Sequence, residues 1–556
     1  MSPGGEQEPV VRVEVSEAVA AGRGEALERL VAERVASRTA SGDATVWGPE
    51  AEAEASKRLG WTRLHETSRG LPAEIAALRG ELLAEGVDRV VLAGMGGSSL
   101  APEVVCAAHG VPLVTLDATD PGQVRDALVE LERTVVVVSS KSGGTVETDS
   151  QRRAFVEAFE QAGIDPARRV VVVTDPGSPL ETAAREAGYR AVFLADPEVG
   201  GRYSALTAFG LVPSGLAGAD VDRLLDEAAA VAGDCARDDA ANPALQLAAA
   251  MAAVPSADGQ GPRDKLVLVD DPAGALPGLP DWAEQLVAES TGKEGVGVLP
   301  VVVPPGAPEV TAGLPDAVVV RCAATHVPHG TADVEGPEDA HVVVTGPLGA
   351  QLLLWEHATA AAGFLLGINP FDQPDVESAK QAARGLLEST PAPREARSTH
   401  HGVDVVADDA TLGSRGADGL DEAVEALLGH LGPHGYLAVM VYLDRLAHAD
   451  LAGARDALAA RSGRPVTFGW GPRFLHSTGQ LHKGGPPVGV FLQVVGDLAE
   501  DLPVPGRDFT FGRLKAAQAD GDAGVLRDHD RPVLTLRVRD AAGLAAVDAA
   551  LRGRAG

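Results

Sequence analysis

The segment from Val135 to Ser150, VVVVSSKSGGTVETDS, places the strongest constraint on how this chain can fold. Its four consecutive valines show no polar alternation, which is typical of a strand buried on both faces of a parallel sheet. The valines are followed by hydroxyl-bearing and small residues, and then at once by a segment compatible with a helix, residues 146–162. A buried strand that runs directly into a helix predicts an α/β fold.

The turn between that strand and helix carries the chemistry of an anion site. The N-terminus of a helix offers unpaired amides and the positive end of the helix dipole. Ser140, Ser142 and Thr145 add hydroxyl groups and Lys141 adds a positive charge, so the natural ligand is a phosphate. Taken alone, the turn supports two interpretations, a serine-capped connection and an anion-binding loop.

The surrounding sequence extends the α/β pattern into three regions. Five predicted strands alternate with helices, which indicates a doubly wound parallel sheet with its ligands at the carboxyl ends of the strands. These strands are 89–93, 112–116, 135–138, 169–173 and 191–194. Further strands are predicted at 265–269, 317–321, 341–344, 435–442, 467–470, 488–495 and 533–538. We therefore divide the chain into a helical lead-in (1–80), two α/β domains (81–235 and 236–395) and a C-terminal α/β region (396–556), with 391–402 as a linker.

Charge and composition narrow the range of partners. The net charge of −32, from 47 basic and 79 acidic residues, disfavours nucleic acid and anionic membranes. It also repels a phosphorylated ligand, so a phosphate site needs local positive charge. The three cysteines have no metal-ligand spacing, the start has no signal-peptide pattern and no apolar run is long enough to span a membrane. We expect a cytoplasmic protein.

Three more short motifs are candidates for the site. Residues 94–98 (GMGGS) form either a plain tight turn or a second small-residue turn facing the same crevice. Arg202, in GGRYS, is either a solvated ion-pair partner or a ligand contact. Glu289, in ESTGK, lies one helical turn after Gln285, on the same face. It is either a solvated charge or a general base.

Two later segments are rich in polar residue types. Residues 369–380 (NPFDQPDVESAK) are predicted to form a loop followed by the start of a helix. Lys380 is either a surface charge or a contact to a substrate oxygen. In residues 476–485 (HSTGQLHKGG) the two histidines are six residues apart, which does not suit a helical metal pair. A histidine that transfers protons and an exposed polar loop are the two interpretations of this segment.

The motifs GMGGS, SKSGGTVET, GGRYS, ESTGK and NPFDQPDVESAK, in this order, resemble the phosphoglucose isomerase family. That family is built from two sugar-isomerase (SIS) domains, and the resemblance covers residues 80–385. With the C-terminal region included, the chain is most similar to the isomerase half of bifunctional transaldolase/phosphoglucose isomerase proteins, without a transaldolase barrel before residue 80.

The resemblance implies interconversion of glucose 6-phosphate and fructose 6-phosphate through a cis-enediol, without a metal or redox cofactor. Glu289 would move the proton between C1 and C2, and Arg202 would stabilise the negative charge of the intermediate. Lys380 would assist ring opening. The remaining implied contacts are Ser140, Lys141, Ser142 and Thr145 to the phosphate, Gly97 and Ser98 along the sugar, and Gln285 and Gln373 to the sugar or phosphate.

The chain departs from the family at one point. The ring-opening histidine of the family lies in a segment H-x-x-x-Q-x-I-x-x-G between ESxGK and NPFDQ, where this chain has no match. The segment beginning at His476 matches that form except at its apolar position, so we expect it to return to the site in space. His326 and His329 are the alternatives. Because the family often takes this histidine from a neighbouring subunit, a homodimer is also expected.

Two other functions stay open at this stage. One is an isomerase of another sugar phosphate, such as mannose 6-phosphate, because spacing does not reveal how sugar stereochemistry is recognised. The other is a non-catalytic SIS module that senses a sugar phosphate, which predicts loss of the base.

Overall fold

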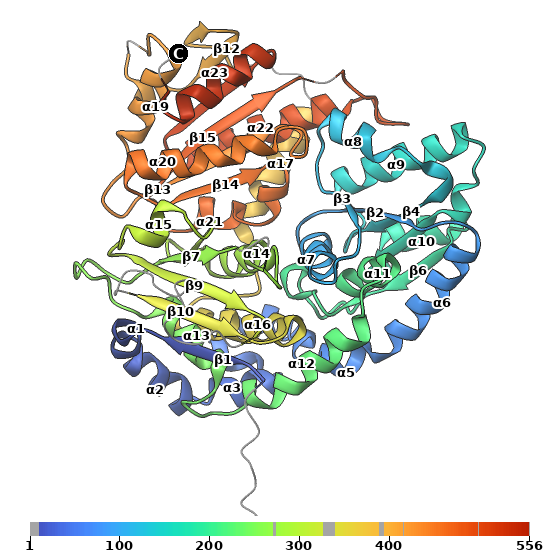
Figure 1. The fold of residues 1–556 in the computed structure, drawn as a ribbon, viewed down its shortest axis with the longest axis horizontal. Helices are drawn as coiled ribbons and strands as arrows, with labels where there is room; N and C mark the ends of the chain where they lie inside the picture. The colour runs from blue at the N-terminus through green and yellow to red at the C-terminus, as the bar shows by residue number, and fades with distance from the viewer. Residues whose placement is uncertain are drawn as a thin grey trace, which may run out of the picture.

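The computed structural model describes residues 10–270, 274–325, 340–388, 394–414, 416–498 and 500–554, except for the side chains of 377–380 and 388. It contains three β-sheets, each covered by helices (Figure 1). The α/β prediction is confirmed. The proposed limits between the regions stay predictions.

The first sheet is built around the valine-rich strand. All six residues of β4 (Thr134–Ser139) are buried, because helices cover both faces of this parallel sheet. The strand order is β3-β2-β4-β5-β6, with every pair parallel. The other strands are β2 (Arg89–Gly94), β3 (Val114–Leu116), β5 (Val170–Thr174) and β6 (Ala191–Leu194), and the helices that follow them are α7 (Leu100–Ala108), α8 (Pro121–Ala127), α9 (Val146–Gln161) and α10 (Pro179–Glu186).

The second sheet has the order β1-β10-β9-β7-β8 and contains two strands that the sequence pattern did not predict. The first, β8 (Leu299–Val303), includes Pro300, which a strand tolerates at a sheet edge because proline cannot donate a hydrogen bond. The second, β1 (Arg12–Val15), comes from the predicted helical lead-in and pairs antiparallel with β10. The remaining elements are β7 (Lys265–Val269), β9 (Ala317–Ala323), β10 (His341–Thr345), α14 (Leu279–Thr291), α15 (Pro308–Thr311) and α16 (Leu348–Leu366).

The third sheet has the order β11-β12-β16-β15-β13-β14. Its first strand, β11 (Ser398–His400), lies within the segment predicted to be a linker, and it pairs antiparallel with β12 (Val403–Val406). A three-residue edge strand is too short to leave a recognisable sequence pattern. The sheet also contains β13 (Tyr436–Tyr442), β14 (Val466–Trp470), β15 (Gly489–Gly496) and β16 (Val533–Val538). Its helices are α18 (Asp409–Leu412), α19 (Leu420–Leu428), α20 (Ala454–Ser462), α21 (Gly479–Gly484), α22 (Phe511–Asp528) and α23 (Ala541–Leu551).

The remaining helices connect and cover the first two sheets, except that α17 (Pro374–Glu388) packs against α21 and α22 of the third sheet. Among the described residues, no helix combines the length and apolar character needed to cross a membrane. These helices are α1 (Glu17–Gly22), α2 (Gly24–Ala32), α3 (Val35–Ala40), α4 (Glu52–Ala55), α5 (Leu64–Thr67), α6 (Leu71–Ala84), α11 (Ala208–Ala217), α12 (Val221–Cys235), α13 (Pro243–Ala252) and α17 (Pro374–Glu388).

The three sheets surround a central region. In Figure 1 the first sheet lies at the right, the second at the lower left and the third at the upper left. Helix α14 of the second sheet contacts α21 of the third, and α17 contacts both α21 and α22. The third sheet is therefore packed against the region in which the predicted site residues meet.

A buried ion pair joins the second and third sheets. Arg455 donates from both terminal nitrogens to Glu309, at 2.7 and 3.0 Å, and both residues are at least 96% buried. We expect Arg455→Met to lower the free energy of unfolding by about 3 kcal/mol, because Glu309 would keep a buried charge without its partner. Urea denaturation measures this change.

The matched control is Arg133→Met. Arg133 makes the same two-pronged contact with Asp88, at 2.7 and 2.8 Å, but both side chains are about half exposed. Its loss should lower the stability much less than the loss of Arg455, because solvent weakens an exposed ion pair. Equal losses in the two variants would contradict the role given to burial.

Candidate active site

A cavity of about 450 Å³ opens where the carboxyl ends of β2, β4 and β5 face helix α14 and the segment around His476. This is the edge of a doubly wound sheet at which ligands bind. The side chains that matter below line it together: Gly97, Ser98, Ser140, Lys141, Ser142, Thr145, Asp175, Gln285, Glu289, Gln373 and His476.

The loop after β4 is held open by its own hydroxyl groups. The Ser140 hydroxyl accepts from the Gly143 amide and donates to Thr145 Oγ1, both at 3.2 Å. The Ser142 hydroxyl accepts from the Gly144 amide, also at 3.2 Å. Thr145 caps α9 without a side-chain bond to the first helix amides, so that end of the helix remains suited to an anion.

Lys141 is tied to the neighbouring strand end. Its Nζ lies 2.6 Å from Asp175 Oδ2 and 3.4 Å from the Pro197 carbonyl oxygen. Burial raises the pKa of Asp175, and the hydrogen bond and charge of Lys141 oppose that rise. The structure therefore shows Lys141 bracing the loop through an ion pair while it also lines the cavity.

The turn after β2 requires glycine at position 97. A Cβ added to Gly97 would lie 2.0 Å from the carbonyl oxygen of Gly201, so only glycine lets the GMGGS and GGRYS turns touch. Ser204 Oγ donates to the Gly97 carbonyl oxygen at 3.2 Å and strengthens this contact. The close approach of the two turns brings Ser98 and Gly201 to the cavity wall.

Glu289 lies near the end of α14 with both carboxylate oxygens engaged. Gln285 Nε2 donates to Oε2 at 3.1 Å, and Arg202 Nη1 lies 3.3 Å from Oε1. Gln285 Nε2 also donates to the backbone carbonyl oxygen of His476 at 2.7 Å. One amide group thus connects the predicted base directly to the segment that carries the predicted histidine.

Arg202 is buried behind this carboxylate and does not line the cavity. Its guanidinium donates to Ser290 Oγ at 2.8 Å and to Gln373 Oε1 at 2.8 Å. It also donates to the carbonyl oxygens of Pro370 and Asp372. Arg202 therefore fixes the loop that presents Gln373 and holds a positive charge beneath Glu289.

A second buried cation supports the same loop. Lys293 Nζ donates to the carbonyl oxygens of Asn369 and Asp372 and to Asp372 Oδ1, at 2.7 to 2.8 Å. Burial and the nearby charge of Arg202 lower the pKa of Lys293 to about 8. The last residue of the ESTGK motif is therefore structural in this state.

The histidine segment reaches the cavity from within the same chain. Gln480 Nε2 donates to the Gly292 carbonyl oxygen at 3.0 Å, and a Cβ at Gly292 would lie 2.3 Å from Leu481 Cα. This packing places His476 on the cavity wall with its Nε2 3.2 Å from Glu147 Oε1. The other histidine, His482, is buried and bonds to the Tyr436 hydroxyl, and burial lowers its pKa to about 3.

Comparison with known proteins gives the family. The Phosphoglucose isomerase family model matches residues 63–299. A probable glucose-6-phosphate isomerase of Natronomonas pharaonis is 33% identical over 54% of this chain and 79% of its own length. The glucose-6-phosphate isomerase of Rubrobacter xylanophilus is 30% identical over 58% of this chain and 87% of its own length. The chain belongs to the phosphoglucose isomerase family.

Some curated relatives are matched over about two thirds of their length. The chain spans 66% of the glucose-6-phosphate isomerase of Gloeothece citriformis, at 29% identity over 54% of this chain. A hypothetical protein of Thermus thermophilus superposes with a TM-score of 0.55 at 26% identity, covering 68% of this chain and 100% of that protein. The glucose-6-phosphate isomerase of Chlamydia trachomatis shares the fold, with a TM-score of 0.53 at 21% identity over 66% of this chain and 86% of that one. The narrower likeness to bifunctional transaldolase proteins stays a prediction.

Ten of the twelve predicted site residues line one cavity. The roles assigned to them stay predictions. Arg202 lies behind the wall. The Lys380 side chain lies outside the described part of the structure, although its backbone belongs to α17, and His326 and His329 also lie outside the described residues.

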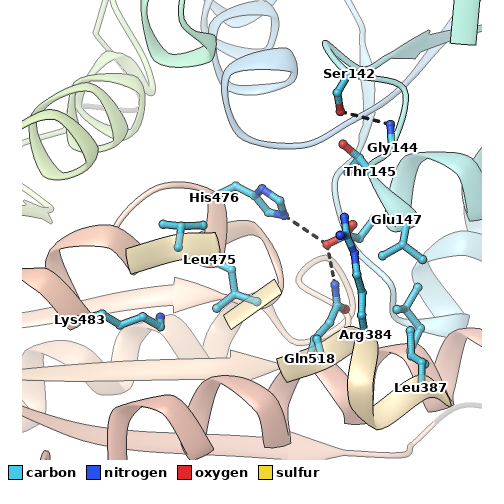
Figure 2. A pocket seen from close by; sticks show the side chains of 14 residues that line it. Ser142, Gly144, Thr145, Glu147, Arg384, Leu387, Leu475, His476, Lys483 and Gln518 are labelled. Carbon is cyan, nitrogen blue, oxygen red and sulfur yellow. Dashed lines mark hydrogen bonds and ion pairs between the residues drawn. The ribbon is translucent and has the colours of Figure 1, made fainter. Parts of the chain in front are cut away.

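A second cavity of about 280 Å³ adjoins the first and reveals residues that the sequence did not predict (Figure 2). It shares Ser142, Thr145 and His476 with the first cavity and is also lined by Glu147 and Gln518. Glu147 lies within the motif SKSGGTVET but was not among the predicted site residues. No local pattern marks Gln518, which is 371 residues away from Glu147.

Glu284 lies on the same helix as Glu289, and its pKa depends on how α14 packs against the histidine segment. Burial and the charge of Asp281 raise the pKa of Glu284 to about 8, against the opposing effects of Arg473 and a hydrogen bond with Ser477. The folded state therefore keeps a proton that the unfolded state loses above pH 4.5, so stability falls as the pH rises from 4.5 to 8.

Glu284→Gln should remove this loss. We expect the variant to match the unaltered protein near pH 5 and to be more stable by at least about 1 kcal/mol at pH 9. Urea unfolding at the two pH values measures the difference, and Glu33→Gln at an exposed position is the control. An equal gain at both pH values would contradict the raised pKa.

Proposed function

We propose that this protein is a glucose-6-phosphate isomerase. The observation that carries the proposal is one cavity that joins a hydroxyl-rich loop at a helix N-terminus to a carboxylate held by Arg202 and Gln285. The loop suits a phosphate dianion, and a positioned carboxylate suits proton transfer between adjacent carbons. Membership of the family supports the same reaction.

In the proposed reaction, the loop from Ser140 to Thr145 binds the phosphate. His476 moves the proton that opens the sugar ring, with its Nε2 engaged by Glu147. Glu289 then removes the proton from C2 of the open chain and returns it to C1. Negative charge on the cis-enediol is stabilised by the guanidinium of Arg202 beneath the site, whose field acts through a water-poor interior.

The proposal includes the wider setting of the enzyme. The reaction belongs to glycolysis and gluconeogenesis and needs no cofactor, and the enzyme is a homodimer of the cytoplasm. Because His476 comes from the same chain, a second copy is not required to supply this histidine. A non-catalytic sensor is disfavoured by the presence of Glu289 in the cavity.

Glu289→Gln tests the proposed base. The amide keeps the size of the side chain but cannot take a proton, so we expect kcat for glucose 6-phosphate to fall by about 10³-fold or more while KM changes little. A coupled assay of fructose 6-phosphate formation measures both constants, with Glu186→Gln on the exposed face of α10 as control. Turnover within threefold of the unaltered protein would remove Glu289 from this role. Mannose 6-phosphate assayed alongside decides which sugar is preferred.

His476→Asn tests the proposed ring-opening residue. We expect kcat to fall by about 10²-fold with KM changed by less than about threefold, because general acid–base catalysis is lost while the phosphate loop is untouched. The matched control is His109→Asn, at the end of α7, where the ring bonds to the carbonyl oxygen of Val105 in the same helix. A loss confined to KM would argue for substrate binding rather than proton transfer.

A further inference from the structure

A row of buried polar side chains runs from the first sheet to His476. The Thr119 hydroxyl donates to Gln518 Oε1 at 2.8 Å, and Gln518 Nε2 donates to Glu147 Oε1 at 2.6 Å. The same Glu147 oxygen lies 3.2 Å from His476 Nε2. Figure 2 shows these contacts of Glu147 with His476 and Gln518.

The direction of each hydrogen bond follows from the chemistry of the groups. An ionised carboxylate only accepts, so Gln518 must turn its amide nitrogen toward Glu147. Its carbonyl oxygen then needs a donor, which the Thr119 hydroxyl supplies. His476 likewise presents a protonated Nε2 to Glu147, which leaves its Nδ1 as the nitrogen able to accept a proton.

Helix α22 is anchored by buried ion pairs on either side of Gln518. Lys515, Gln518 and Asp522 lie at spacings of three and four residues, hence on one face of the helix. Lys515 Nζ pairs with Asp120 at 2.9 Å, one residue after Thr119, and Asp522 pairs with Lys483 at 2.6 Å. All three side chains are at least 97% buried.

These two ion pairs fix α22 to both sides of the site. Asp120 belongs to the loop between β3 and α8, and Lys483 belongs to α21, which follows His476 along the chain. Gln518 lies between the two anchors, so its amide is held at a defined distance from Glu147. Groups that orient a proton-transferring histidine act through such fixed geometry.

We propose that Gln518 is a positioning residue: by holding Glu147, it orients the His476 ring for proton transfer. Removing Gln518 would take away the 2.6 Å bond to Glu147 Oε1 and allow the carboxylate and the ring to shift. The inference rests on the proposed function, because it assigns Gln518, on a helix of the third sheet, a part in that reaction.

Gln518→Met tests the inference, because methionine has a similar length and no amide. We expect kcat for glucose 6-phosphate to fall by about 10- to 100-fold while KM stays within about threefold, since the ring is misplaced but the phosphate loop is intact. Thr119→Val should cause a smaller loss of kcat in the same direction, because Gln518 would keep its bond to Glu147.

The matched control is Gln493→Met. Gln493 is a buried glutamine of β15 whose amide donates to the Ala519 carbonyl oxygen on α22 at 2.9 Å and whose oxygen accepts from Thr535. It has the same chemistry and contacts the same helix, but it does not line either cavity. Equal losses of kcat in the two glutamine variants would overturn the inference, because the effect would then be a general weakening of α22.

A second measurement does not depend on turnover. In protein labelled with ¹⁵N-histidine, the imidazole N–H signal of His476, assigned by its absence in His476→Asn, should shift or broaden in Gln518→Met and stay unchanged in Gln493→Met. An unchanged signal together with kcat within twofold overturns the inference. A changed signal in a protein that shows no isomerase turnover even when unaltered supports the positioning and refutes the proposed function.

Discussion

The site depends on one amide group, the side chain of Gln285. Its nitrogen bonds both to Glu289 Oε2, on its own helix, and to the backbone of His476, nearly two hundred residues later. A buried carboxylate requires donors, and a buried backbone oxygen requires one as well. Because a single NH₂ group meets both requirements, α14 and the histidine segment cannot move apart without leaving polar groups unpaired. The close contact between Gly292 and Leu481 strengthens the same junction.

The overall charge of the protein is unfavourable for an anionic ligand at the cavity. A net charge of −32 opposes the approach of a phosphate dianion, although salt limits this repulsion to about 10 Å. Within the site, Lys141 is paired with Asp175 and Arg202 is paired with Glu289. We therefore expect hydroxyl groups and backbone amides of the loop to provide much of the recognition of a phosphate, while the paired cations give the loops their shape. The same pairing keeps Arg202 buried at modest cost, because its remaining donors bond to backbone oxygens.

The motifs predicted which residues would lie together around the cavity, but not the hydrogen bonds and ion pairs between them. The loop from Ser140 to Thr145 and the helix bearing Gln285 and Glu289 were recognisable because their spacing is local. Glu147 was visible inside a motif, yet His476 and Gln518 lie more than three hundred residues away from it, so no pattern near it could show these bonds. Arg202 was predicted to contact the ligand. Its position behind Glu289 depends on hydrogen bonds to the loop at 370–373, which only folding brings close to it. For the fold, long strands such as β4 and β13 were predictable, whereas edge strands as short as β11 or interrupted by Pro300 were not.

The sequence by itself determined the α/β class, the hydroxyl-rich loop at a helix N-terminus and the family, because each depends on short runs of residues whose chemistry acts locally. The tertiary structure decided that His476 reaches the cavity from the third sheet of the same chain, because packing at Gly292 and the bonds of Gln480 and Gln285 join segments far apart in sequence. It also decided that Thr119, Gln518 and Glu147 form one row with that histidine. Hydrogen bonds between distant segments depend on the positions of whole helices and sheets, and those positions follow from the packing of the complete core.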